Sequence, residues 1–209
     1  MKGSQRIGAY AALLQGILFV VLLILFAVVL PGQGVTSFSQ LGTDAAKAAT
    51  VAPILAVISL IVLFDSASVI LVTLALYDRM QAGAPTRMRY AVAGATIASA
   101  LFLGQAMLGI VGGRLLGGVT DASLIGPANL AFGLISQSLL SAAVFAAAVS
   151  SLVWAWAALA TKNFSAALSY VVILGGVAAI VSIFVPALQL VEFVLNAIWS
   201  LWLGYVLMR

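Results

Sequence analysis

The chain has 209 residues, of which 65% are hydrophobic and only 7% are charged. Soluble globular domains are about half apolar and about one-quarter charged, so this composition excludes a soluble domain and predicts an integral membrane protein. The formal net charge is only +4, and the basic residues are scattered along the chain, which argues against a protein that binds nucleic acid.

Six apolar runs follow one another along the chain, and each is long enough to cross a bilayer as a helix. They are residues 7–30, 51–77, 90–113, 129–160, 167–187 and 188–208. The first run is much longer than the apolar core of a signal peptide, so we expect it to be an uncleaved span. The sequence therefore predicts a single domain over residues 1–209. The predicted fold is that of an all-α, polytopic membrane protein, a bundle of six transmembrane helices.

The segments between the runs carry turn residues, such as PGQG after the first run and QAGAPT after the second. Before the second run, Thr43 or Asp44 is a suitable N-cap for a helix that continues into that run. The glycine-rich segment 114–128 is expected to be a loop. The last two runs are separated only by Pro186 and Gln189, which is the weakest of the predicted breaks.

The distribution of Lys and Arg predicts the orientation of the bundle. If the N-terminus lies inside, the inner side carries Lys2, Arg6, Arg79, Arg87, Arg89, Lys162 and Arg209, whereas the outer side carries Lys47 and Arg114. Because loops on the cytoplasmic side are enriched in basic residues, we predict that both termini are inside. We expect a multi-pass protein of a cell inner membrane.

The two acidic residues inside the predicted spans are Asp65 and Glu192. Asp65 lies about 20 Å from either end of its run, with no basic residue at its depth. A carboxyl group without water or a counter-charge is expected to be neutral and to bond to a neighbour such as Gln105 or a serine. Glu192 lies near the outer end of the last span, and Asn196 follows one turn later on the same face.

These acids and amides form the candidate ligand-binding set, which is Asp65, Gln105, Gln137, Glu192 and Asn196. One interpretation is a polar cavity that opens to the outside, with Asp65 at its floor, because intramembrane acids commonly mark functional sites. The other is a set of hydrogen bonds between helices, which we favour for Gln15, Gln105, Gln137 and the serines. Glu192 has two further alternatives: its side chain extends to the outer surface, or it pairs with Arg114.

Small residues recur at four-residue spacing within the spans, for example at Gly8, Ala12 and Gly16. This spacing is typical of transmembrane helices whose backbones approach closely. We therefore expect ordinary close helix packing along this face of the first span.

Three stretches resemble an uncharacterised family of six-helix bacterial membrane proteins, domain of unknown function 4386. They are QRIGAYAALLQGILFVVLLILFAVVLP, LFDSASVILVTLALYDRM and VEFVLNAIWSLWLGYVLMR. Together they cover about half of the chain in the order of the family. The resemblance implies six helices, a bacterial inner membrane and an aspartate at position 65, but no reaction.

The sequence contains neither Cys nor His, which excludes disulfides and Cys/His metal sites. Because it also lacks a nucleophile beside a base, we expect no catalytic residues, no metal site and no enzyme; the sequence points to no cofactor.

The bilayer is the expected partner, together with a second copy or a membrane complex. Two functions remain open: a bundle that binds or conducts a small molecule, lipid or ion around Asp65, or an accessory or scaffold subunit.

Overall fold

The computed structural model describes residues 3–35, 45–112 and 122–209. Within these ranges the chain is helical apart from short turns, and it contains no β-strand. The helices are α1 (Gly3–Ile24), η1 (Leu25–Val29), α2 (Leu30–Gly32), α4 (Ala45–Met80), α5 (Pro85–Met107), η2 (Leu108–Gly112), α7 (Ala122–Thr161), α8 (Ala166–Ser182), η3 (Pro186–Leu188) and α9 (Gln189–Met208). The predicted all-α bundle is confirmed.

Five stretches of the described chain are long and apolar enough to cross a membrane. They are Gly3–Gly32, Thr50–Met80, Pro85–Gly112, Leu130–Thr161 and Pro186–Met208. The remaining helix, α8, has 17 residues, which is about 25 Å of helix where a hydrocarbon core is about 30 Å thick. The predicted span 167–187 is therefore shorter than expected.

The early end of α8 has a local cause. Pro186 cannot donate a backbone hydrogen bond and disfavours a helical conformation at the residue before it. Val185 accordingly has φ −127° and ψ 85°, outside the helical region. The amides of Phe184 and Val185 both bond to the carbonyl of Val181, which closes the last turn. Residues 183–188, called the hairpin tip below, then connect α8 to α9.

Two predicted connections are helical where the structure describes them. The second span starts within a helix that begins at Ala45, as expected, although its predicted caps Thr43 and Asp44 lie outside the described residues. Residues 122–128 belong to α7 and not to a loop, which corrects our interpretation of that part of segment 114–128. Pro127 lies in the second turn of α7, where its missing amide interrupts only the start of the hydrogen-bond ladder.

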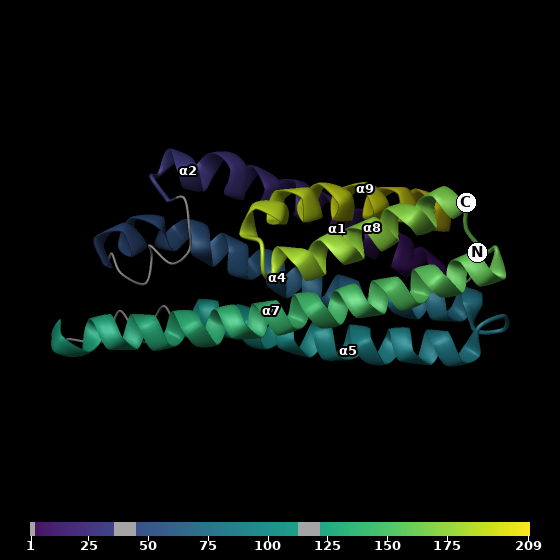
Figure 1. Cartoon of the computed structure of the whole chain (residues 1–209), viewed down its shortest axis with the longest axis horizontal. Helices are drawn as coiled ribbons and strands as arrows, with labels where there is room; N and C mark the ends of the chain where they lie inside the picture. Colours follow the sequence, from purple (N-terminus) through teal and green to yellow (C-terminus); the bar gives the residue numbers. More distant parts are fainter. Residues whose placement is uncertain (1–2, 36–44, 113–121) are drawn as a thin grey trace.

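The six long helices form a closed ring. In chain order α1 packs against α4, α4 against α5, α5 against α7, α7 against α8 and α8 against α9, and α9 returns to α1. Figure 1 shows α7 as the longest helix, and the hairpin of α8 and α9 stops well short of the far ends of α4 and α7. The ring leaves an interior into which all six helices can direct side chains.

Small residues allow the closest approaches in this ring. A Cβ atom added to Gly8 would lie 2.2 Å from the Cβ of Ala75 in α4, and one added to Gly16 would lie 2.6 Å from the Cγ of Leu201 in α9. The expected close packing along this face of α1 is confirmed. It holds α1 against both of its neighbours.

Both ends of the described chain lie at one end of the bundle (Figure 1). We call it the basic end, because six basic residues gather there: Arg6, Arg79, Arg87, Arg89, Lys162 and Arg209. The guanidinium of Arg87 lies 3.9 Å from the ring centroid of Trp156, and that of Arg79 lies 4.8 Å from that of Phe164. Such pairs of basic and aromatic side chains are typical of a membrane surface. That this surface faces the cytoplasm stays a prediction.

Candidate functional site

A cavity of about 190 Å³ lies inside the ring, and all six long helices line it. Its polar lining consists of two acids, four amides and five hydroxyls. They are Asp65 and Glu192; Gln15, Gln137, Gln189 and Asn196; and Thr73, Ser141, Ser150, Ser151 and Ser182. The interior of the bundle is therefore partly polar around this cavity and not a continuous apolar core.

Asp65 lies on α4 and is only 7% exposed. Its Oδ1 atom accepts a hydrogen bond of 3.0 Å from Nε2 of Gln15 on α1. The serines near it on α4 are occupied elsewhere, because Ser66 donates to the carbonyl of Leu63 and Ser68 to that of Phe64. The partner of Asp65 is thus an amide on a neighbouring helix, not Gln105 or a serine as we expected.

Gln15 carries a second feature of the site. Its side chain is 4% exposed, and its Oε1 atom has no hydrogen-bond partner among the described residues. A buried acceptor without a partner is unfavourable by about 1–3 kcal/mol. Gln15, which lines the cavity, does form the interhelical bond expected of it, but it also keeps a buried acceptor without a partner.

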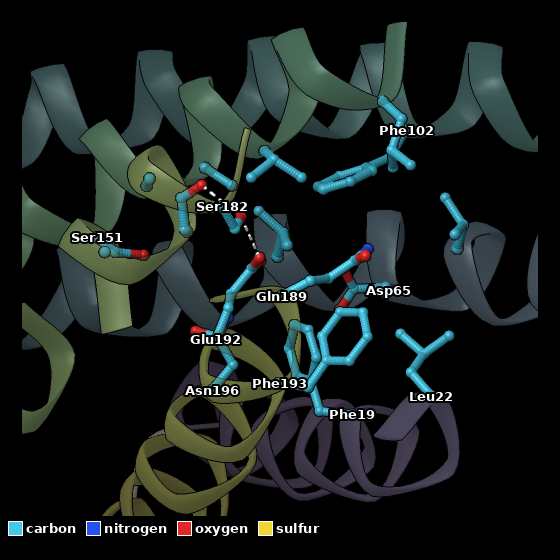
Figure 2. Close-up of a pocket in the computed structure, with 18 of the residues that line it drawn as sticks. Phe19, Leu22, Asp65, Phe102, Ser151, Ser182, Gln189, Glu192, Phe193 and Asn196 are labelled. Atoms are coloured by element: carbon cyan, nitrogen blue, oxygen red, sulfur yellow. Dashed lines mark hydrogen bonds between the residues drawn. The ribbon is translucent and has the colours of Figure 1, made fainter. Parts of the chain in front are cut away.

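Glu192 lies in the first turn of α9 and is 6% exposed. Its Oε2 atom accepts a hydrogen bond of 2.7 Å from the hydroxyl of Ser182, the last residue of α8 (Figure 2). The side chain is therefore buried and does not extend to the outer surface. The alternative partner, Arg114, lies outside the described residues.

Asn196 and Glu192 both line the cavity from α9, as their spacing of one turn indicates. The Oδ1 atom of Asn196 accepts a bond of 2.6 Å from Nε1 of Trp199. Gln137 also lines the cavity and has an exposed side chain, so it marks the edge of the cavity on α7. Four of the five candidate residues therefore share one cavity.

Gln105 is the candidate that the structure places elsewhere. It is 8% exposed, does not line the cavity, and donates from Nε2 to the hydroxyl of Ser136 at 3.3 Å. It therefore connects α5 to α7. Helical depth alone did not reveal this, because residues at one depth can face different neighbours around a ring.

Two amide side chains of the site were not among the candidates, those of Gln15 and Gln189. Figure 2 shows the side chain of Gln189 extending toward Asp65. The sequence does contain a signal for Gln189, because it precedes Glu192 by three residues and so shares its helix face. For Gln15 the sequence contains no comparable signal.

Aromatic rings form one wall of the cavity. The ring centroids of Phe26 and Phe193 are 5.3 Å apart at an interplanar angle of 72°, and those of Phe19 and Phe193 are 6.1 Å apart. Phe19 and Phe193 line the same cavity as Asp65, and all three are labelled in Figure 2. The site thus combines two carboxyl groups with electron-rich ring faces.

In the part of the chain that the structure describes, no three His, Cys, Asp or Glu side chains are grouped as they would be around a metal ion. No family model, curated protein or solved structure matches this chain. The resemblance to domain of unknown function 4386 therefore stays a prediction.

Proposed function

We propose that this protein is a non-enzymatic membrane bundle that binds or conducts a small molecule, lipid or ion in the cavity around Asp65. The observation that carries the proposal is that Asp65 and Glu192, from α4 and α9, line one cavity. Acidic side chains within a membrane are costly and usually belong to a pathway or a binding site. A purely structural bundle has no need to place two of them around one space.

The volume of the cavity supports the same proposal. In a soluble protein core, an enclosed cavity of about 190 Å³ would cost on the order of 5 kcal/mol. Larger side chains at Ala147, Ala148 or Ala179, which line the space, would remove most of that cost. Small residues at these positions are therefore consistent with a cavity that a ligand occupies.

We place the proposed site in an inner membrane with both termini inside. The support is the gathering of six basic residues at the end of the bundle that carries the termini, whereas Lys47 lies near the opposite end of α4. In this orientation the hairpin tip lies toward the outside, and so does the edge of the cavity at Gln137.

Native mass spectrometry from a mild detergent tests the proposal. We expect the purified protein to carry a small-molecule adduct that collisional activation removes. Ala147→Leu adds a branched side chain at the cavity wall and should remove the adduct. The matched control is Ala142→Leu on the same helix, at an exposed position outside the cavity, which should retain it.

Two results would contradict the proposal. One is a protein without an adduct, or with an adduct that both variants keep. The other is a protein that leaves the membrane bound to a stoichiometric partner subunit and to nothing small, which would favour an accessory or scaffold subunit.

A further inference from the structure

We infer that the ligand of this cavity is an amphipathic primary amine, held as its ammonium ion between Asp65, Glu192 and Gln15. This inference rests on the proposed function and adds the chemical class of the ligand. Four features of the cavity support it: its charge, its free acceptor, its aromatic wall and the position of its mouth.

The described residues that line the cavity include acidic side chains but no basic ones. Asp65 and Glu192 contribute two carboxyl groups, and no Lys or Arg is present among the residues that line the cavity. Each carboxyl group receives one neutral hydrogen bond, from Gln15 and from Ser182 respectively, and neither bond supplies a counter-charge. A cation would supply the counter-charge that lets these groups ionise, whereas an anion would find no counter-charge among the described lining residues.

The free acceptor indicates that the cation carries N–H groups. Gln15 lines the cavity, and its Oε1 atom is buried without a partner among the described residues, in the same amide that donates to Asp65. An ammonium group has three donors and no acceptor. It can therefore satisfy this carbonyl and a carboxylate together, which a quaternary ammonium ion cannot do.

The remaining wall fits an apolar body attached to the amine. Phe19, Phe26 and Phe193 form a packed aromatic cluster that lines the same cavity as Asp65, and Phe19, Phe193 and Asp65 are labelled in Figure 2. Ring faces attract a cation within about 6 Å of the centroid. Aliphatic side chains on α1 and α4, among them Leu22 and Ile58, complete this side.

The mouth of the cavity suits a molecule that partitions into the bilayer. Pro186 in the hairpin tip and Gln137 on α7 both line the cavity and are exposed, so the cavity reaches the surface of the bundle at these residues. The neighbouring Phe184 is 79% exposed. Helix α9 has 20 residues, so the tip lies about 30 Å from the basic end, close to the opposite membrane surface. Amphipathic amines accumulate at that surface with their chains in the lipid.

Isothermal titration in dodecyl maltoside, with protein-free micelles as the blank, tests the inference with three six-carbon probes. Hexylamine is the cationic probe, 1-hexanol the neutral one and hexanoate the anionic one. We expect hexylamine to bind at least about tenfold more tightly than hexanol, as expected for a hydrogen bond between charged groups, and hexanoate not to bind. Dihexanoylphosphatidylethanolamine carries the same amine beside a phosphate, so its affinity relative to hexylamine tells whether a lipid headgroup or a free amine is preferred.

Asp65→Asn/Glu192→Gln is the decisive variant, because both amides keep an oxygen that accepts the bonds from Gln15 and Ser182. It should bind hexylamine no better than hexanol. If the double variant does not fold, Glu192→Gln alone replaces it and should weaken the binding of hexylamine in part. Asp78→Asn removes an acid from α4 outside the cavity and should change nothing.

The outcomes separate this inference from the proposed function. If hexanol or hexanoate binds as tightly as hexylamine, or if the double variant keeps the preference for the amine, the inference is overturned while the binding cavity stands. If none of the probes binds and the purified protein carries no adduct, both the inference and the proposed function fail.

Discussion

Nε2 of Gln15 lies 3.0 Å from Oδ1 of Asp65, although the two residues are 50 positions apart in the chain. The bond joins α1 to α4 in the interior of the ring. It also orients the Gln15 amide, whose Oε1 atom is left buried without a partner among the described residues. This one pair of side chains therefore gives the buried carboxyl group of Asp65 a hydrogen-bond donor and leaves the Oε1 atom of Gln15 without a partner.

The Gln15–Asp65 bond predicts that Asp65→Asn and Asp65→Leu differ in stability. Asn keeps a side-chain oxygen that accepts from Gln15, so the unfolding temperature in detergent should change little. Leu leaves both polar ends of Gln15 without partners and should lower the free energy of unfolding by about 1–3 kcal/mol. Thermal unfolding followed by circular dichroism measures both. Equal destabilisation by the two substitutions would contradict this account of the bond.

The Ser182–Glu192 bond predicts coupling across the hairpin. In a double-mutant cycle, Ser182→Ala and Glu192→Met should show a coupling free energy of about 0.5–1.5 kcal/mol, as measured for hydrogen bonds between transmembrane helices. Ser151 lines the same cavity but makes no described bond to Glu192, so Ser151→Ala is the control and should be additive with Glu192→Met. Additivity in both cycles would show that the 2.7 Å contact contributes nothing to stability.

Close packing of α1 predicts opposite effects for two Gly→Ala substitutions. A Cβ at Gly8 would lie 2.2 Å from Ala75 Cβ, so Gly8→Ala must separate α1 from α4 and should destabilise the bundle by about 1–3 kcal/mol. Gly133 lies within α7 with no atom within 4 Å of its added Cβ. Gly133→Ala should therefore be neutral or stabilising by up to about 1 kcal/mol. A destabilised Gly133 variant beside an unchanged Gly8 variant would contradict the described packing.

The predicted orientation can be tested by cysteine labelling, because the chain contains no Cys. Gln33 follows α2 and Gln81 follows α4, and both are exposed. With the termini inside, Gln33→Cys should react in intact cells with a membrane-impermeant maleimide. Gln81→Cys should react only after the membrane is opened. The reverse pattern would place the termini outside.

The bundle was predictable from the sequence because apolar length and turn residues report directly on helices in lipid. The end of α8 at Ser182 was not, since an apolar run through residues 183–185 conceals the effect of Pro186 on the backbone before it. Helical spacing correctly put Glu192 and Asn196 on one face. It could not give the order of helices around the ring, which decides that Gln15 and not Gln105 contacts Asp65.

The central claim is that a ligand occupies the cavity of Asp65 and Glu192, and tryptophan quenching tests it most directly. Trp154 and Trp199 line this cavity, whereas Trp156 and Trp202 do not. In the Trp156→Phe/Trp202→Phe variant only the two cavity tryptophans emit. We expect 6-bromohexylamine to quench them saturably, and hexylamine to reverse the quenching by competition. Quenching that rises linearly without saturation, and equally in the Trp154→Phe/Trp199→Phe variant, would show that the probe only partitions into the detergent and would contradict binding of an amine in the cavity; if the purified protein also carries no adduct, the ligand site itself is contradicted.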